Sequence, residues 1–161
     1  MPRASLKKAL PVFLCICFCL PGLARAEFQA KVIEVKDGDS FLALFKGRTI
    51  EVRIHGIDAP EWTQPFGEKA KSFLRKKTFL KRVTIRVVAW DQYNRAVAEV
   101  ILLSGENLGH EMVKAGMAWW YRRYAPNNRT LARLEARAKN KKQGLWRQSH
   151  PEPPWLFRQR Q

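Results

Sequence analysis

Five charged residues stand at spacings that suit chemistry at a phosphate group: Asp39, Arg53, Asp58, Glu61 and Arg95. Carboxylates are hard oxygen ligands of the kind that Ca²⁺ accepts. A guanidinium matches two phosphate oxygens as a fork, and its charge does not titrate away at ordinary pH. Hydrolysis of a phosphodiester requires that the phosphoryl charge be neutralised, a water activated and the leaving oxygen stabilised. Together, these five side chains could meet those three requirements.

Each of these residues also has a plain structural interpretation. Asp-Gly is a common turn pair, so the aspartates of residues 37–39 could simply cap a turn. Glu61 could be one surface glutamate among many, and Arg53 could be a solvated strand residue. Because the chain holds 30 lysines and arginines, a single arginine means little, and its position in the fold must decide.

Most of the elements that would position these residues are strands. Alternating or β-branched stretches predict five strands, over residues 28–36, 40–45, 49–57, 82–90 and 95–103. Helical spacing predicts about three helices, over residues 66–77, from about 107 to 115, and from about 128 to just before 144. The first three strands form a meander. Together these elements predict an α+β fold, a five-stranded OB-fold-like Greek-key barrel with about three α-helices.

The segment 49–57 shows how the pattern separates core from surface. Ile50, Val52 and Ile54 fall on one face of this strand. Arg53 falls on the opposite, polar face, where an ordinary strand would not need it.

Residues 1–26 have the pattern of a secretory signal peptide. Basic residues precede an apolar run over residues 9–23, and small residues at 24 and 26 form an A-x-A site. The run is shorter than the ~20 residues that a membrane-spanning helix needs, although an uncleaved membrane anchor is the alternative. We therefore expect export to the periplasm or the outside, as a mature chain that begins near Glu27 and is not stably inserted in a membrane.

All three cysteines of the chain, Cys15, Cys17 and Cys19, lie in this leader. A mature chain without cysteine has no disulfide framework, no cysteine-ligated zinc site and no thiol nucleophile. The three histidines show no metal-binding spacing. Packing alone must therefore hold the mature protein together.

The charge of the chain is strongly positive. The formal net charge is +16, and the leader holds four basic residues and no acidic ones, which leaves +12 on residues 27–161. Such a field favours a polyanionic partner, either nucleic acid or an acidic membrane surface. No predicted helix has an apolar face broad enough to favour binding to a membrane surface.

Several motifs occur together at fixed spacings. They are DGDS at 37–40, Arg53, IDAPE at 57–61, YNR at 93–95, YAPNN at 124–128, GLW at 144–146 and PPW at 153–155. Fourteen positions separate Asp39 from Arg53, five more lead to Asp58, and three more to Glu61. In this combination the chain resembles the staphylococcal nuclease family, as a bacterial exported member, over about residues 28–157.

The resemblance implies a metal site. It assigns one Ca²⁺ ion to the carboxylates of Asp39 and Asp58 and to the backbone carbonyl of Ala59, with Asp37 as a carboxylate that orients the site. Mg²⁺ is possible but less suited. Because the contact of Ala59 is through its main chain, alanine in place of the more familiar threonine should not abolish it.

The resemblance also implies catalytic and substrate-binding roles. Glu61 acts as general base or positions the attacking water, and Arg53 and Arg95 stabilise the transition state at the scissile phosphate. Tyr93 and Tyr124 contact the nucleotide by phosphate hydrogen bonds and base stacking.

The chain departs from the family pattern at three places. Asn94 stands where the familiar nuclease has glycine, and asparagine tolerates the positive φ that such a turn needs. Arg122 replaces an aromatic of the nucleotide pocket, and stacking by Arg122 itself or by the neighbouring Tyr121 could compensate. The loop 62–67 is shorter than in the staphylococcal enzyme, so substrate access could differ.

These observations predict a calcium-dependent nuclease that hydrolyses DNA and RNA with little sequence specificity and leaves 3′-phosphate products. We expect a monomer with its nuclease domain over residues 27–147 and a proline-rich basic tail over 148–161. The alternative is a non-catalytic nucleic-acid-binding module of the same OB type. Nuclease-like domains of that kind typically lack the acidic and arginine set that this chain retains.

Overall fold

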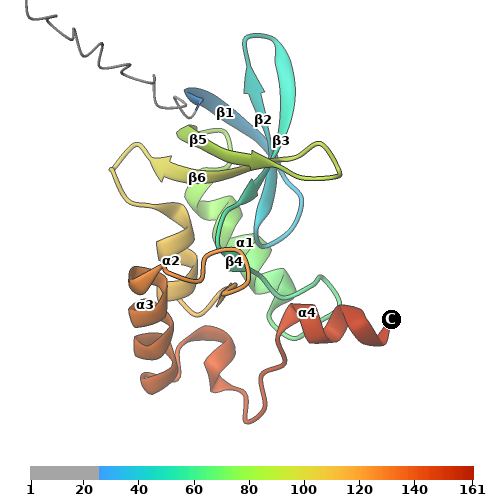
Figure 1. The fold of residues 1–161 in the computed structure, drawn as a ribbon, viewed down its shortest axis with the longest axis vertical. Coiled ribbons are helices and arrows are strands. Elements are labelled where there is room, and N and C mark those ends of the chain that lie inside the picture. Colours follow the sequence, from blue (N-terminus) through green and yellow to red (C-terminus); the bar gives the residue numbers. More distant parts are fainter. Residues whose placement is uncertain (1–25) are drawn as a thin grey trace, which may run out of the picture.

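A closed β-barrel forms the centre of the molecule (Figure 1). The computed structural model describes residues 26–161, so the predicted signal peptide lies outside the described residues apart from Ala26. The barrel strands are β1 (Glu27–Val35), β2 (Ser40–Phe45), β3 (Arg48–Ile54), β5 (Arg82–Trp90) and β6 (Ala96–Leu102). Their order is β1-β2-β3-β6-β5, with β5 returning to β1, and only the β3–β6 pairing is parallel. The predicted five-stranded OB-like barrel is confirmed.

Small and β-branched side chains fill the barrel. Val52 and Ile54 of β3 point inward and are buried, whereas Arg53 between them is only partly buried, as the alternation predicts. Alanine and valine dominate the other inward positions of the strands, together with the larger Phe41 of β2 and Ile85 of β5. The alanines and valines include Ala30, Val32, Ala43, Val83, Val87, Ala96, Ala98 and Val100.

Three helices pack around the lower part of the barrel (Figure 1). Helix α1 (Gly67–Thr78) contacts β1, and α2 (Leu108–Lys114) packs against both β6 and α3 (Arg129–Asn140). Asparagine side chains cap the starts of α2 and α3: Asn107 accepts a hydrogen bond from the backbone N–H of His110 at 3.1 Å, and Asn128 accepts one from the backbone N–H of Leu131 at 3.0 Å. None of the helices in residues 26–161 is long and apolar enough to cross a membrane.

The predicted strand over residues 49–57 is wrong at its end. Strand β3 stops at Ile54 because Gly56 adopts a φ of 78°, which turns the chain out of the barrel wall. The chain then forms β4 (Ile57–Asp58), which pairs with β7 (Trp119–Trp120) in a separate two-stranded sheet. This turn carries Asp58 out of the barrel sheet and into a buried position.

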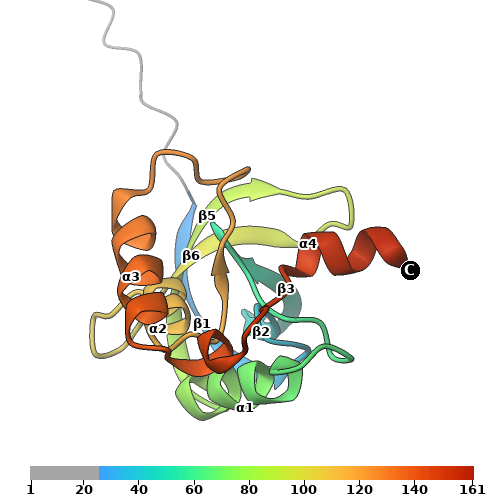
Figure 2. The ribbon, with the colours of Figure 1, turned by 90° about the horizontal axis from the view of Figure 1, so that it is seen from below.

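The segment 148–161 is folded against the body of the protein. It holds the short helix α4 (Pro154–Phe157) and a 3-10 turn, Arg158–Arg160, after another 3-10 turn at Gly144–Arg147. Pro154 is buried, and Gln64 donates a hydrogen bond to the carbonyl of Glu152 at 3.2 Å. Both views place α4 on the side of the molecule away from α3 (Figure 2).

Candidate active site

One cavity of about 330 Å³ brings together every site residue predicted from the sequence. The residues that line it come from the turn between β1 and β2, from β3, and from β4 and the loop after it. The loops that follow β5 and β7 and the C-terminal segment complete the lining. The nine predicted residues that line it are Asp37, Asp39, Arg53, Asp58, Ala59, Glu61, Tyr93, Arg95 and Tyr124. Tyr121, named from the sequence only as a stacking substitute in the nucleotide pocket, also lines it, and so does Arg158, which was not predicted.

The turn that carries Asp39 is rigidly built. The carboxylate of Asp37 accepts hydrogen bonds from the backbone N–H groups of Asp39 and Ser40, at 2.9 and 2.7 Å, and from the hydroxyl of Ser40 at 2.7 Å. A Cβ at Gly38 would lie 2.5 Å from the Cβ of Ala59, so only glycine lets the turn approach the residues after β4 so closely. The Asp37 carboxylate therefore fixes the backbone that presents Asp39.

Arg53 joins two buried aspartates. Its Nη1 lies 2.9 Å from Asp39 Oδ1 and its Nη2 lies 2.8 Å from Asp58 Oδ1. The second oxygen of Asp39 accepts a hydrogen bond from the backbone N–H of Ala59 at 2.9 Å. Asp39 is 3% exposed and Asp58 is 0% exposed. The two carboxylates thus face one another across a single guanidinium.

This arrangement leaves the site with excess negative charge. Burial raises the pKa of Asp39 to about 8 against the opposing charge of Arg53, and the nearby carboxylates of Asp37 and Asp58 add to the rise. Burial alone would lower the pKa of Arg53, but Asp39 and Asp58 raise it above its ordinary value. Arg53 is therefore always charged, and one cation serves a pair of buried acids.

Arg158 supplies a second cation from the end of the chain. Its Nη2 lies 2.8 Å from Asp58 Oδ2, and its Nη1 lies 2.5 Å from Glu61 Oε1. Burial would lower the pKa of Arg158, but Asp58 and Glu61 outweigh it and raise the pKa. One signal in the sequence could have indicated this contact: Trp155, Leu156 and Phe157 form an apolar run in a basic, proline-rich tail, and such a run needs a surface to pack against.

Arg95 reaches the cavity from the turn between β5 and β6. Its Nε lies 2.8 Å from Asp91 Oδ2, and Asp91 Oδ1 accepts from the backbone N–H groups of Arg95 and Tyr93, both at 3.0 Å. Partial burial would raise the pKa of Asp91, but these hydrogen bonds outweigh it and lower the pKa. Asn94 adopts a φ of 59°, as predicted for this turn. Asp91, which the sequence did not single out, holds Arg95 beside the cavity.

Glu61 and the two predicted tyrosines stand at the cavity mouth. The side chain of Glu61 is 38% exposed, and its backbone N–H donates to Gln64 Oε1 at 2.9 Å. Tyr93 and Tyr124 are 70% and 61% exposed. A substrate arriving from solvent therefore meets these three residues before it meets the buried aspartates.

The donor set fits a hard divalent cation that keeps part of its water shell. Residues 26–161 contain no cluster of three or more histidine, cysteine, aspartate or glutamate side chains that could hold a metal ion. Asp39 and Asp58 are two buried carboxylates that share Arg53, Asp58 also pairs with Arg158, and the main chain of Ala59 lies beside Asp39. Oxygen donors of this kind suit Ca²⁺ or Mg²⁺, with water completing the coordination.

Comparisons with known proteins agree with this geometry. Residues 51–148 match the sequence model of the family described as "Staphylococcal nuclease homologue". An uncharacterized endonuclease of Escherichia coli is 33% identical over 155 residues, which cover 96% of this chain and 99% of the relative. An uncharacterized endonuclease of Haemophilus influenzae is 34% identical, over 96% of this chain and 86% of its own. A micrococcal nuclease of Shigella flexneri is 34% identical, over 84% and 83%.

Proposed function

Because this chain belongs to the staphylococcal nuclease family and is a nuclease, we propose that it uses Ca²⁺ to hydrolyse both DNA and RNA. The observation that carries the proposal is the single cavity in which two buried aspartates, Glu61 and two arginines converge. Each class of group that phosphodiester hydrolysis requires is present in that cavity.

Asp39, Asp58 and the carbonyl of Ala59 would hold the ion. When bound, a divalent cation neutralises phosphoryl charge and polarises the oxygens that it contacts. Ca²⁺ is favoured over Mg²⁺ because it accepts irregular sets of oxygen ligands, whereas Mg²⁺ demands a near-ideal octahedron. Arg53 already bonds one oxygen of each aspartate, and such a constrained pair suits the less demanding ion.

The two arginines would bind the phosphate that is being cleaved. Arg95 uses its Nε to bond Asp91, and its Nη atoms make no ion pair among residues 26–161, so they can turn to phosphate oxygens. Arg53 lies deeper and fixes the aspartates as well as contributing charge. These contacts would act mainly as negative charge develops in the transition state.

Glu61 would accept the proton of the attacking water or position that water. Its partial exposure supports this role, because a water at the cavity mouth can reach its carboxylate. In the structure Arg158 is paired to this carboxylate, so Arg158 must move aside when Glu61 acts.

Tyr93 and Tyr124 would stack on bases of any identity, which supports low sequence specificity. The resemblance to the family implies products with a 3′-phosphate.

Export through the N-terminal leader is a further part of the proposal. The n-region, apolar run and A-x-A site of residues 1–26 support it. After cleavage the protein would be a monomer in the periplasm or outside the cell, without membrane insertion. N-terminal sequencing of protein recovered from periplasm and medium tests this, and a recovered chain that still begins at Met1 would contradict it.

The test of the enzymatic proposal is direct. Residues 27–161 are incubated with plasmid DNA and with RNA in calcium, in magnesium and in chelator. We expect cleavage of both substrates in calcium, loss in chelator and recovery on adding calcium back. End-labelling of the products then reports where the phosphate remains. Undiminished cleavage in chelator would overturn the metal assignment, and salt-sensitive binding without cleavage in calcium would establish the non-catalytic module instead.

A further inference from the structure

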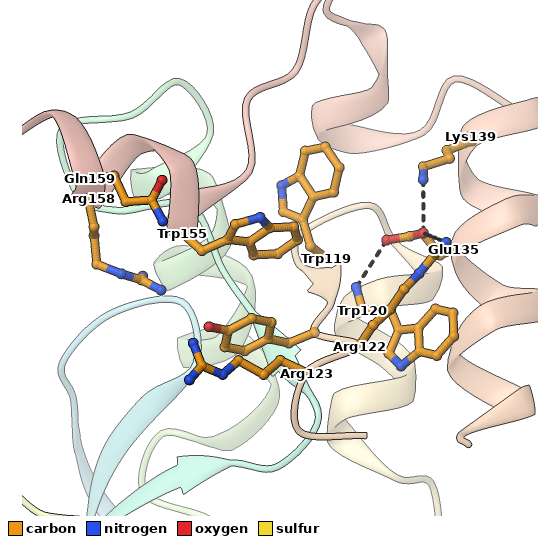
Figure 3. A pocket seen from close by; sticks show the side chains of 10 residues that line it. Trp119, Trp120, Arg122, Arg123, Glu135, Lys139, Trp155, Arg158 and Gln159 are labelled. Atoms are coloured by element: carbon orange, nitrogen blue, oxygen red, sulfur yellow. Dashed lines mark hydrogen bonds and ion pairs between the residues drawn. The ribbon is translucent and has the colours of Figure 1, made fainter. Parts of the chain in front are cut away.

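A second cavity, of about 660 Å³, adjoins the candidate active site (Figure 3). Tyr121 and Arg158 line both cavities, so the two are neighbours that share a wall. Trp155 and Arg158 enter the second cavity from the C-terminal segment, and Glu135 and Lys139 face them from α3 (Figure 3). A volume of this size is in the range of small-molecule sites.

Aromatic rings that are held in place form one wall of the second cavity. Trp155 stacks on Tyr121 with ring centroids 5.1 Å apart and an interplanar angle of 4°. The edge of Trp119 meets Trp155 at 5.8 Å and 73°. Pro154, directly before Trp155, is buried and anchors the ring. Because these rings are already ordered, stacking a ligand on them costs little conformational entropy.

Cationic side chains form the rest of the lining. Arg122, Arg123 and Lys139 join Arg158 there. Glu135, which is 4% exposed, is already paired to Lys139 at 2.8 Å and accepts a hydrogen bond from the backbone N–H of Trp120 at 3.1 Å. Arg122 makes only a long ion pair with Glu135, at 3.9 Å, and its side chain is 71% exposed, so its guanidinium can turn to a ligand. The cavity therefore presents aromatic faces inside a net positive field.

We propose that this cavity is a nucleotide subsite of the nuclease. It takes the base and the phosphate of a nucleotide that neighbours, on the same strand, the one whose phosphodiester occupies the candidate active site. The proposal rests on the proposed function, because the shared wall of Tyr121 and Arg158 is what joins the two sites along one strand. The base stacks on the Trp155–Tyr121 wall, and Arg122 and Arg123 contact the phosphate.

The chemistry of the lining identifies the ligand class. Aromatic faces interleaved with guanidinium groups are what single-stranded nucleic acid needs, because every base has a π-face and every nucleotide a phosphate. A paired base cannot stack on a side chain without leaving its duplex, which costs unstacking energy. The subsite therefore takes an unpaired nucleotide and is indifferent to the identity of the base.

The experiment measures binding separately from cleavage. The full mature chain in chelator is titrated into a fluorescein-labelled short oligothymidylate, and anisotropy gives Kd. We expect Trp155→Ala to weaken binding about tenfold, Arg122→Ala to weaken it severalfold, and Trp155→Phe to retain most of the affinity, because phenylalanine keeps a stacking face. A duplex of the same length should lose little affinity in the Trp155 variants.

The matched control is Arg82→Ala, which removes the same charge from the start of β5, where Arg82 lines neither cavity. Circular dichroism checks that each variant is folded, and the exposure of Arg122 makes its removal safe for the fold. If Trp155→Ala and Arg122→Ala bind like Arg82→Ala, the subsite is wrong, even where the wild type cleaves plasmid. If they weaken binding while the wild type fails to cleave, the subsite stands and the proposed function falls.

Discussion

Asp39 and Asp58 are carboxylates that the fold buries almost completely around one guanidinium. Taking such charges out of water is costly, and the shared Arg53, together with the partly exposed Arg158 on Asp58, offsets only part of that cost. Nothing in the packing of the barrel requires acids at these positions. The site is therefore destabilising in the metal-free protein, which is the expected signature of residues retained for chemistry.

Asp39→Asn should make the metal-free protein more stable at and above neutral pH. The folded pKa of Asp39, about 8, lies above its unfolded value of about 3.9, so the folded state favours the protonated form. The Asp39 carboxyl group therefore stabilises the folded state fully below about pH 4, and this contribution is lost as the pH rises toward 8. Asparagine stays neutral and keeps one hydrogen bond, so we expect a gain of about 1–2 kcal/mol at pH 8.

The measurement is urea unfolding of both proteins in chelator at pH 8 and at pH 4.5. The gain should shrink at the lower pH, where the wild-type carboxyl is protonated in the folded state. Cleavage should be lost at either pH. A variant that is less stable than the wild type at pH 8 would show that the Asp39–Arg53 pair outweighs the burial.

Arg95 and Arg53 should respond differently to truncation to alanine. Arg95 pairs with a partly exposed acid on its own turn, so Arg95→Ala should cost less than about 1 kcal/mol of stability and cut turnover on the order of a hundredfold to a thousandfold. Arg53→Ala leaves the buried Asp39 without its cation and Asp58 with Arg158 alone, and it should cost about 3–5 kcal/mol as well as activity. Thermal unfolding and single-turnover cleavage of both variants separate the two effects. Equal loss of stability in both would contradict the bridging role of Arg53.

The elements that the sequence predicted well are those with a local signal. Strands over 40–45 and 82–90 have the predicted bounds because their alternation runs to a turn at each end. The helix starts near 107 and 128 could be predicted because an asparagine cap bonds only to backbone groups of its own first helical turn.

The elements that the sequence missed depend on distant partners. Strands β4 and β7 have two residues each, too few for any periodicity. They exist because Asp58 pairs with Trp119, 61 positions further along the chain. Helix α4 has four residues and exists because Trp155 packs on Tyr121. The ion pairs of Arg158 follow from that docking. No spacing rule connects a residue to a carboxylate a hundred positions away.

Helix α4 gives the C-terminal segment a measurable influence on the ion site. Arg158 bonds Asp58, a proposed ion ligand, and Glu61, so its guanidinium competes with a divalent cation for the same negative charge. Arg158→Ala should therefore tighten cation binding by several fold. Calorimetric titration of the apo protein with Ca²⁺ measures this without any turnover.

The matched control for that experiment is Arg160→Ala. Arg160 belongs to the same 3-10 turn but pairs with Glu152, which lines neither cavity. Its removal should leave calcium affinity unchanged. Weaker calcium binding in Arg158→Ala would mean that Arg158 organises the ion site and does not compete for it.

The charge of the protein is distributed unevenly between its two cavities and the rest of its surface. Residues 27–161 have a formal net charge of +12, yet the candidate active site is locally acidic, with four carboxylates lining one cavity. A uniform positive field would bind nucleic acid anywhere along the surface. The second cavity adds a cationic wall directly beside the acidic one, so a strand can be held by its flanking phosphates while one phosphate meets the carboxylates and arginines.

Because cationic side chains would hold the flanking phosphates, we predict that the affinity for single-stranded nucleic acid depends steeply on salt concentration. Each phosphate that a lysine or arginine neutralises releases condensed counterions, so log Kd should rise linearly with log salt, by about 0.7 per contact on a single strand. In chelator, anisotropy titrations of a labelled oligothymidylate over a range of NaCl concentrations give the slope. Removing the exposed Arg122 should lower the slope by about 0.7. Arg160→Ala, which takes the same charge from a side chain that lines neither cavity, should lower it less. A slope near zero would show that the positive field contributes nothing to capture and that stacking alone holds the strand.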